Sequence, residues 1–147
     1  MPFKAAPGSR GGFFEFSRNL RTFADQLDAT VDDLTKRLAL AIYNGVVMKT
    51  PVATGMARAN WQILVHGDQV AVREVGDHSA EDLAQLSSFK VVGQGKILIA
   101  NGVSYIKALE YGHSQKAPEG MVRVTMAEVE MRLNEIMKEA IIAKQRV

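Results

Sequence analysis

The three histidines are the first candidates for chemistry, because imidazole binds metals and titrates near neutral pH. His66, His78 and His113 are spaced twelve and thirty-five residues apart. None lies four residues from another or from a second strong ligand on a predicted helix, whereas zinc sites show closely paired ligands. The chain has no cysteine, which excludes thiolate metal sites, disulfides and cysteine nucleophiles. We therefore predict no metal site and no bound cofactor.

Glu110 and His113 are a second candidate, because a carboxylate can orient and charge a nearby imidazole. Ser114 follows them, but no nucleophile elbow or oxyanion glycine pattern surrounds it, so we interpret the pair as a surface hydrogen bond. The segment GQGKI, residues 93–97, lacks the spacing of a phosphate loop and indicates a turn before a strand. The sequence predicts that the chain is not an enzyme. One alternative is a small hydrolase that uses Glu110, His113 and Ser114. In that case substitution of one of these residues would abolish hydrolysis while assembly would survive.

Composition is that of one globular domain. The 147 residues are 47% apolar and 23% charged, and no stretch approaches the roughly 18 uncharged apolar residues of a spanning helix. The first twelve residues lack the apolar core of a signal peptide. The net charge is +2, and residues 61–120 carry seven acids against five bases, so the basic excess lies at the two ends. A small nucleic-acid-associated protein using these basic ends is the second alternative, although no concentrated basic face is evident.

Long helices are predicted on both sides of the central part of the chain, after a short N-terminal arm. Residues 1–12 combine prolines and glycines and are predicted to be a flexible arm, so the domain covers residues 13–147. A stripe of apolar residues at helical spacing from Phe16 predicts a long helix ending at Thr50, with a break near residues 28–30 as an alternative. Opposite charges at helical spacing predict two ion pairs, Asp32 with Lys36 and Asp33 with Arg37. A second long amphipathic helix is predicted from Val122 to Ala143.

The middle of the chain is predicted to form strands and short helices. Residues 60–67 and 69–76 alternate and predict a hairpin with Gly67-Asp68 as its turn. A short helix capped by Ser79, or an ordered loop, follows in residues 77–89, then a third strand in residues 96–102 and a brief helix stopped by Gly112. The fold class is therefore α+β, a small antiparallel β-sheet packed with a long N-terminal and a long C-terminal helix.

The stretch KTPVATGMARANWQI, residues 49–63, contains the only tryptophan of the chain. Pro51 ends the long helix, Thr54 and Gly55 form a turn, and small residues allow close packing around Trp61. Large amphipathic rings such as Trp61 and Tyr111 are frequent in protein contacts, but a core position for Trp61 stays open. Core filling is the preferred interpretation of the methionines near the C-terminus, over an adaptable contact surface. They are Met121, Met126, Met131 and Met137.

Two blocks of this sequence resemble a family of small bacteriophage proteins that act in head-to-tail joining and tail completion of long-tailed phages. TPVATGMARANWQ resembles that family's Thr-Pro-Val-x-Thr-Gly-x-x-Arg-x-x-Trp pattern, with Ala53 where the family often has an acid. We call its matching residues the first signature: Thr50, Pro51, Thr54, Gly55, Arg58 and Trp61. IANGVSYIKALEYGHSQKAPEGMVRVT resembles the family's second block. We call its matching residues the second signature: Asn101, Tyr105, Glu110, Tyr111, Gly112, Pro118, Gly120, Met121 and Val122.

The resemblance covers about residues 14–145 and implies a structural, non-enzymatic virion protein of the neck or tail. It implies a ring of copies of this chain, hexameric or dodecameric, that joins a head-side connector or stopper protein to the tail tube protein. DNA would only pass through the lumen, no membrane is involved, and assembly takes place in the host cytoplasm. Our hypothesis is that Arg58 and Glu110 make charged contacts with neighbours. Residues 76–95, expected to be a loop, and 112–119 including His113 are expected to meet adjacent subunits or rings.

Overall fold

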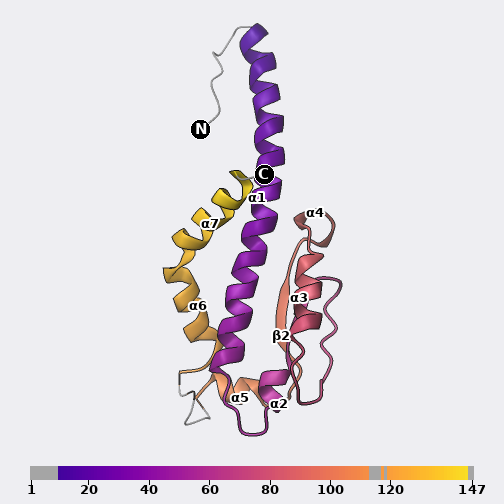
Figure 1. Cartoon of the computed structure of the whole chain (residues 1–147), viewed down its shortest axis with the longest axis vertical. Helices are drawn as coiled ribbons and strands as arrows, with labels where there is room; N and C mark the ends of the chain where they lie inside the picture. Colours follow the sequence, from indigo (N-terminus) through magenta and orange to yellow (C-terminus); the bar gives the residue numbers. More distant parts are fainter. Residues whose placement is uncertain (1–9, 113–116, 118, 146–147) are drawn as a thin grey trace.

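The computed structural model describes residues 10–112, 117 and 119–145. Its longest element is helix α1, Arg10–Lys49, whose N-terminal half extends beyond the rest of the molecule (Figure 1). The helix starts inside the predicted arm and runs without interruption through residues 28–30. Residues 10–12 of the arm are thus helical, and residues 1–9 lie outside the described residues. The helix ends as predicted, because Pro51 forces Thr50 out of the helical conformation.

The sheet has two antiparallel strands, β1 (Trp61–Leu64) and β2 (Leu98–Asn101), in which Trp61 lies opposite Asn101 and Leu64 opposite Leu98. The predicted strand in residues 96–102 is confirmed, but the predicted hairpin is wrong. Residues 69–74 follow β1 without strand pairing. Side-chain amides of Asn60 and Gln62 bond the backbone of Arg73 and Ala71. These contacts replace the ladder that a hairpin would have formed.

Short helices connect the rest. They are α2 (Met56–Ala59), α3 (Ser79–Ser87), α4 (Val91–Gln94) and α5 (Ile106–Glu110). Helix α3 confirms the predicted short helix, although His78 takes the N-cap position and Asp77 accepts the Ser79 N–H at 2.9 Å. Helix α5 also confirms its prediction, and Gly112 follows it with a positive φ of 87°.

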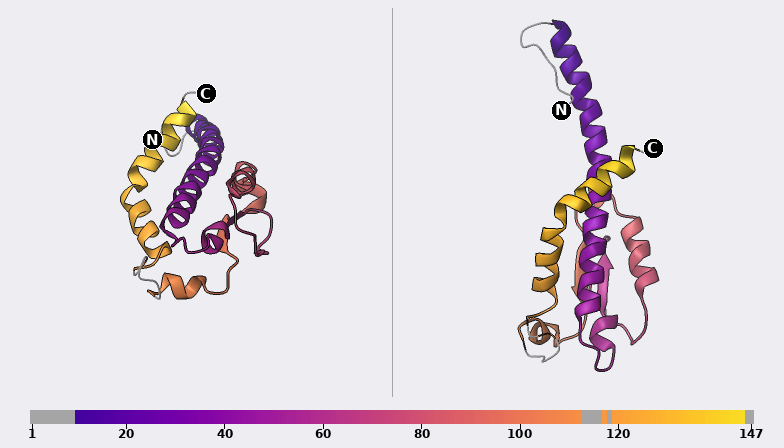
Figure 2. Two further views of the ribbon diagram at one scale, coloured as in Figure 1. Left: turned by 60° about the horizontal axis from the view of Figure 1, so that its bottom comes forward. Right: turned by 60° about the vertical axis from the view of Figure 1, so that its left-hand side comes forward.

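The predicted α+β class is confirmed, with helical regions at both ends of the chain; the C-terminal one divides at Arg132 into α6 (Val122–Met131) and α7 (Leu133–Gln145), so only its continuity was predicted wrongly. The change of direction carries both helices along α1, where Val129 of α6 and Ile136 and Ala140 of α7 are buried (Figure 2). Helix α1 therefore lies between α6 and α7 on one side and the sheet with α3 on the other (Figures 1 and 2). No helix in the described ranges is both long and apolar enough to cross a membrane.

The core lies where α1 meets the sheet and α3. Trp61, Ile63 and Val65 alternate along the chain toward α1, as the two-residue period of a strand requires. Tyr43 and Val46 contribute from α1. The core location of Trp61 is thereby settled, and its side chain is only 5% exposed. Among the methionines Met121 is buried, but Met126, Met131 and Met137 are exposed, so core filling is wrong for these three.

One of the two predicted ion pairs is confirmed. Arg37 Nε lies 2.8 Å from Asp33 Oδ2. Asp32 instead accepts the Val91 N–H at 2.7 Å, and Lys36 donates to the Ser87 carbonyl at 3.1 Å. Both side chains therefore connect α1 to the end of α3 and the start of α4, a non-local use that helical spacing does not predict.

Gly45 allows α1 and α6 to approach closely, since a Cβ there would lie 2.5 Å from Thr125 Cγ2. We predict that Gly45→Ala lowers the free energy of unfolding by about 1–3 kcal/mol, because overpacking exceeds the roughly 1 kcal/mol gain in helix propensity. Thr125→Ala removes the obstructing atoms, so the double variant should recover most of the loss. Urea unfolding followed by the fluorescence of Trp61 measures both. A Gly45→Ala protein more stable than the parent would contradict this packing.

Candidate functional site

The first signature forms a rigid junction at the end of α1. Thr50 is buried, and its hydroxyl accepts the Trp61 Nε1–H at 2.7 Å while donating to the Val46 carbonyl at 2.5 Å. One hydroxyl thus satisfies the indole and a carbonyl in the last turn of the helix. The tryptophan is thereby fixed relative to α1, and the strand that begins with it is fixed as well.

Arg58 completes the junction. Its Nη2 donates to the carbonyls of Met48 and Thr50 at 3.2 and 3.1 Å, which are among the unpaired carbonyls at the C-terminus of α1. Gly55 precedes α2 with a φ of 82°, a conformation that favours glycine. Thr54 Oγ1 accepts the Met56 N–H at 3.2 Å, so the predicted Thr-Gly turn is present. The side chain of Arg58 therefore has a structural role inside the chain.

Asn101 joins the second signature to the first. Its amide donates to the Ala57 carbonyl of α2 at 2.8 Å, and its Oδ1 accepts the Val103 N–H at 3.0 Å. Asn101 also lies opposite Trp61 in the sheet. The two blocks, separated by about forty residues in the sequence, are therefore in direct contact.

Glu110 caps helix α6. Its Oε1 accepts the N–H groups of Met121 and Val122 at 2.8 and 2.7 Å, and its Oε2 accepts the backbone N–H and the Nε–H of Arg123 at 3.1 and 3.0 Å. A carboxylate at a helix N-terminus is favoured by the unpaired N–H groups and the helix dipole. Gly120, with φ 89°, permits the contact, since a Cβ there would collide with Glu110.

The environment of Glu110 also sets its charge state and the place of its neighbour. Burial acts to raise the pKa of Glu110, but the N–H groups of Val122, Met121 and Arg123 outweigh it and hold the pKa below the ordinary 4.5. Arg123 donates to the Glu110 carbonyl as well, and its guanidinium lies 5.1 Å from the centre of the exposed Tyr111 ring. Tyr111 is therefore held at the surface beside the cap.

Asp82 is the centre of a buried polar network that the sequence analysis did not find. Its carboxylate accepts the Tyr43 hydroxyl at 2.6 Å, the Ile63 N–H at 3.2 Å and both Nη atoms of Arg73 at 2.7 and 2.9 Å. The hydrogen bond with Asp82 raises the pKa of Arg73, and burial together with that carboxylate raises the pKa of Tyr43. Both shifts keep the two donors protonated. The only sequence signal was an acidic residue on the inner side of a short amphipathic helix.

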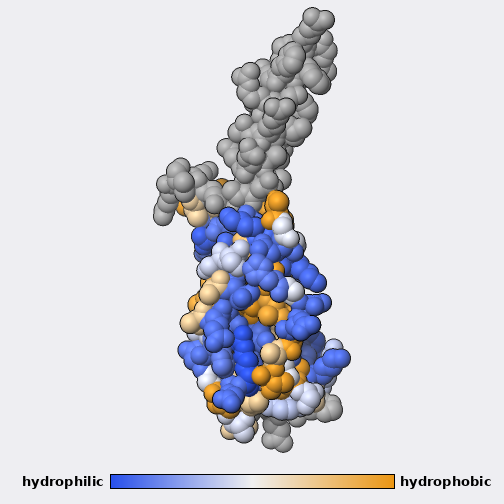
Figure 3. Space-filling view, turned by 90° about the vertical axis from the view of Figure 1, so that its right-hand side faces the viewer, coloured by the Kyte–Doolittle hydropathy of each residue, from blue (hydrophilic) through white to orange (hydrophobic). Residues whose placement is uncertain are grey.

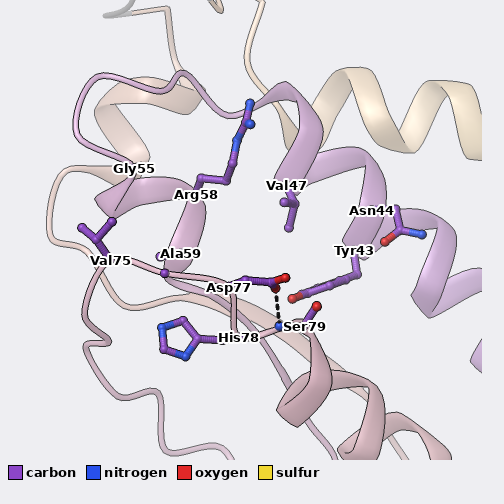
Figure 4. Close-up of a pocket in the computed structure, with 11 residues that line it drawn as sticks. Tyr43, Asn44, Val47, Gly55, Arg58, Ala59, Val75, Asp77, His78 and Ser79 are labelled. Atoms are coloured by element: carbon purple, nitrogen blue, oxygen red, sulfur yellow. Dashed lines mark hydrogen bonds between the residues drawn. The ribbon is translucent and has the colours of Figure 1, made fainter.

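A hollow of about 400 Å³ lies next to this network (Figure 4). Tyr43, Asn44 and Val47 of α1 line it together with Arg58 and Ala59 of α2 and residues 75–79 (Figure 4). Two of its polar side chains are engaged locally: Asp77 accepts a hydrogen bond at the start of α3, and His78 bonds the Glu74 carbonyl at 2.8 Å. Across the described part of the chain no group of three or more His, Asp or Glu side chains could hold a metal ion.

The structure brings both signatures to one end of the molecule, around the end of α1, α2 and α5 (Figure 1). Tyr105 takes the N-cap position of α5 and is partly exposed. His113, Ser114 and Pro118 lie outside the described residues. The expectation of a loop throughout residues 76–95 is wrong, because the range contains the predicted helix α3 and the kinked α4, in which Val92 and Gly93 have non-helical φ/ψ. No family model, no curated protein and no solved structure matches the chain.

We predict that Asp82→Asn lowers the free energy of unfolding by about 3–5 kcal/mol, because it leaves Arg73 without its buried partner charge. Tyr43→Phe removes one donor only and should cost about 1–3 kcal/mol. The control Asp68→Asn, at an exposed position between β1 and α3, should change the free energy of unfolding by less than about 0.5 kcal/mol. Urea titration of the three variants gives the order, and an equal cost for Asp82→Asn and Asp68→Asn would refute the network.

We predict that Glu110→Gln removes part of the acid sensitivity of the fold. The pKa of Glu110 is lower in the folded than in the unfolded chain, so its contribution is complete above about 4.5 and is lost as the pH falls through the lower folded value. The variant should lose about 1–3 kcal/mol at pH 7 and vary less with pH below 4.5. Glu119→Gln, at an exposed neighbouring position, is the control. Parallel pH curves for the parent and Glu110→Gln would contradict the cap.

Proposed function

We propose that this chain is a structural virion protein of the neck or tail of a long-tailed phage. In this proposal copies of the chain form a ring that joins the head-side connector to the tail tube, as a tail-completion or tail-terminator protein. It acts by interlocking with its neighbours and carries out no reaction. The observation that carries the proposal is the contact between the two signatures, in which Asn101 binds Ala57 and faces Trp61.

This contact supports the proposal because it joins the two blocks that carry the resemblance into one structural unit. Here the first signature fixes Trp61 against α1, and the second signature supplies the residue opposite it and the cap of α6. The described polar side chains of both signatures thus stabilise the same end of the molecule.

The surface of the C-terminal helices gives independent support for assembly. Met131, at the break between α6 and α7, is 86% exposed, and Met126, Met137, Ile141 and Ile142 are each at least 40% exposed. Met137 and Ile141 are four residues apart and so lie on one face of α7, and exposed apolar side chains that gather on one face indicate a contact surface. Methionine adapts its shape to a partner, which suits a subunit that meets several neighbours. The neighbours in this proposal are further copies of the chain, the connector or stopper protein and the tail tube protein.

We predict that the purified chain has a mass near six or twelve times 16.1 kDa, or that six or twelve copies assemble only when its connector or tube partner is added. Sedimentation and light scattering measure the mass, and electron microscopy of the same sample should show rings. The alternative function, binding of nucleic acid by the basic ends, predicts a complex only with DNA or RNA that weakens steeply with salt. Absence of the chain from purified virions would refute the proposal.

A further inference from the structure

Strand β2 has an edge with unused backbone groups. The Gly102 N–H donates to the Asn60 carbonyl, and the register of the sheet then makes the pairs Gln62 with Ala100 and Leu64 with Leu98 the hydrogen-bonded ones. The backbone groups of Ile99 and Asn101 consequently point away from β1. No hydrogen bond to them is found within residues 10–112, 117 and 119–145. Such an edge is a template for another strand.

A second edge lies on the extended segment Gln69–Val75, which we call the valine segment. The backbone of Ala71 and Arg73 is bonded on one side by the amides of Gln62 and Asn60. In an extended chain the intervening backbone groups, those of Val70 and Val72, point the opposite way. These groups too have no hydrogen-bond partner in the described part of the chain.

The side chains of the valine segment suit a strand rather than a solvated loop. Val70, Val72 and Val75 are 40%, 68% and 59% exposed, and β-branched residues favour strands. Figure 3 views the molecule from the side of α3 and shows hydrophobic residues gathered between hydrophilic ones on this face. The sequence alone already predicted a strand here. The monomer therefore holds a segment with strand character in an extended form without giving it a strand partner.

We propose that β2 of one copy pairs antiparallel with the valine segment of the next copy, so that the sheet continues across the subunit interface. This inference deepens the proposed function, on which it rests for the ring. In the register that places Val72 opposite Ile99, Val70 lies opposite Asn101. Both pairs are then hydrogen-bonded pairs, and four backbone groups on each side find partners.

The small size of the sheet also favours the pairing. A short, isolated two-stranded sheet is of marginal stability, and a third strand would extend it. Because the two edges are different surfaces, the contact is heterologous, and it closes into a ring if the rotation between copies allows.

Cross-linking tests the pairing, and the absence of native cysteine makes it clean. In the proposed register Ala71 and Ala100 form a non-hydrogen-bonded pair, whose Cα atoms lie about 4.5 Å apart, within disulfide range. Ala71→Cys chains are mixed with differently tagged Ala100→Cys chains and oxidised at the highest soluble concentration. We expect a mixed dimer as the main product. Mixing Ala84→Cys, at an exposed site on α3, with Ala100→Cys is the control and should give only background.

A second pair of variants tests the backbone directly. Val72→Pro removes an N–H that has no partner inside the chain and should shift the protein toward monomer in sedimentation, with little change in unfolding. Val72→Ala keeps the N–H and should retain association. A mixed dimer no more abundant than the Ala84→Cys control overturns the pairing, whether or not Val72→Pro folds. Rings that form without this cross-link would refute the pairing and leave the proposed function standing. A protein that forms the cross-link but is absent from virions would refute the proposed function and leave the pairing standing.

Discussion

The carboxylate of Asp82 is the interaction on which the arrangement of the domain depends. It is fully buried, and it binds α1 through Tyr43, β1 through the Ile63 N–H and the connection before α3 through Arg73. A buried charge is tolerated only when it is paired and its remaining lone pairs are satisfied, and here four donors meet two oxygens. The three segments cannot separate without exposing or orphaning a charge, so their relative positions are fixed together.

The hydrogen bonds of Asp82 also limit the number of strands in the sheet. The Ile63 N–H, which a neighbouring strand would otherwise bind, is occupied by a side chain of α3. Asn60 and Gln62 likewise bond the valine segment through their side-chain amides. Side chains therefore take the place of backbone pairing along β1, and the sheet stays at two strands. The unused backbone edge of the valine segment follows from this substitution, because its bonds on one side go to side chains and not to a strand.

Local chemistry explains which elements the sequence analysis predicted. The confirmed elements each depend on residues adjacent in the chain. They are the end of α1 before Pro51, helix α3 after Asp77, strand β2 ending at Asn101 and helix α5 before Gly112. The wrong predictions involve partners far apart. The alternation in residues 69–76 indicates strand character, but it does not tell whether a second strand or the side-chain amides of Asn60 and Gln62 bond that segment. The break at Arg132 depends on the packing of α7 along α1. For the same reason Arg73 and Asp82 gave no sign that they form a pair.

The engagement of the signature side chains separates the scaffold from the surfaces available to partners. Four signature side chains form their hydrogen bonds within the chain: Thr50, Arg58, Asn101 and Glu110. A partner that bound these groups would first have to break those bonds. These four side chains therefore belong to the scaffold, and the residues accessible to a partner are exposed ones such as Tyr111 and those outside the signatures. Exposed apolar side chains outside the signatures include Val72 on the valine segment and Met131 at the break between α6 and α7. The valine segment is bonded to the sheet on one side of α1, and the break between α6 and α7 lies on the other side, so α1 separates these two apolar surfaces.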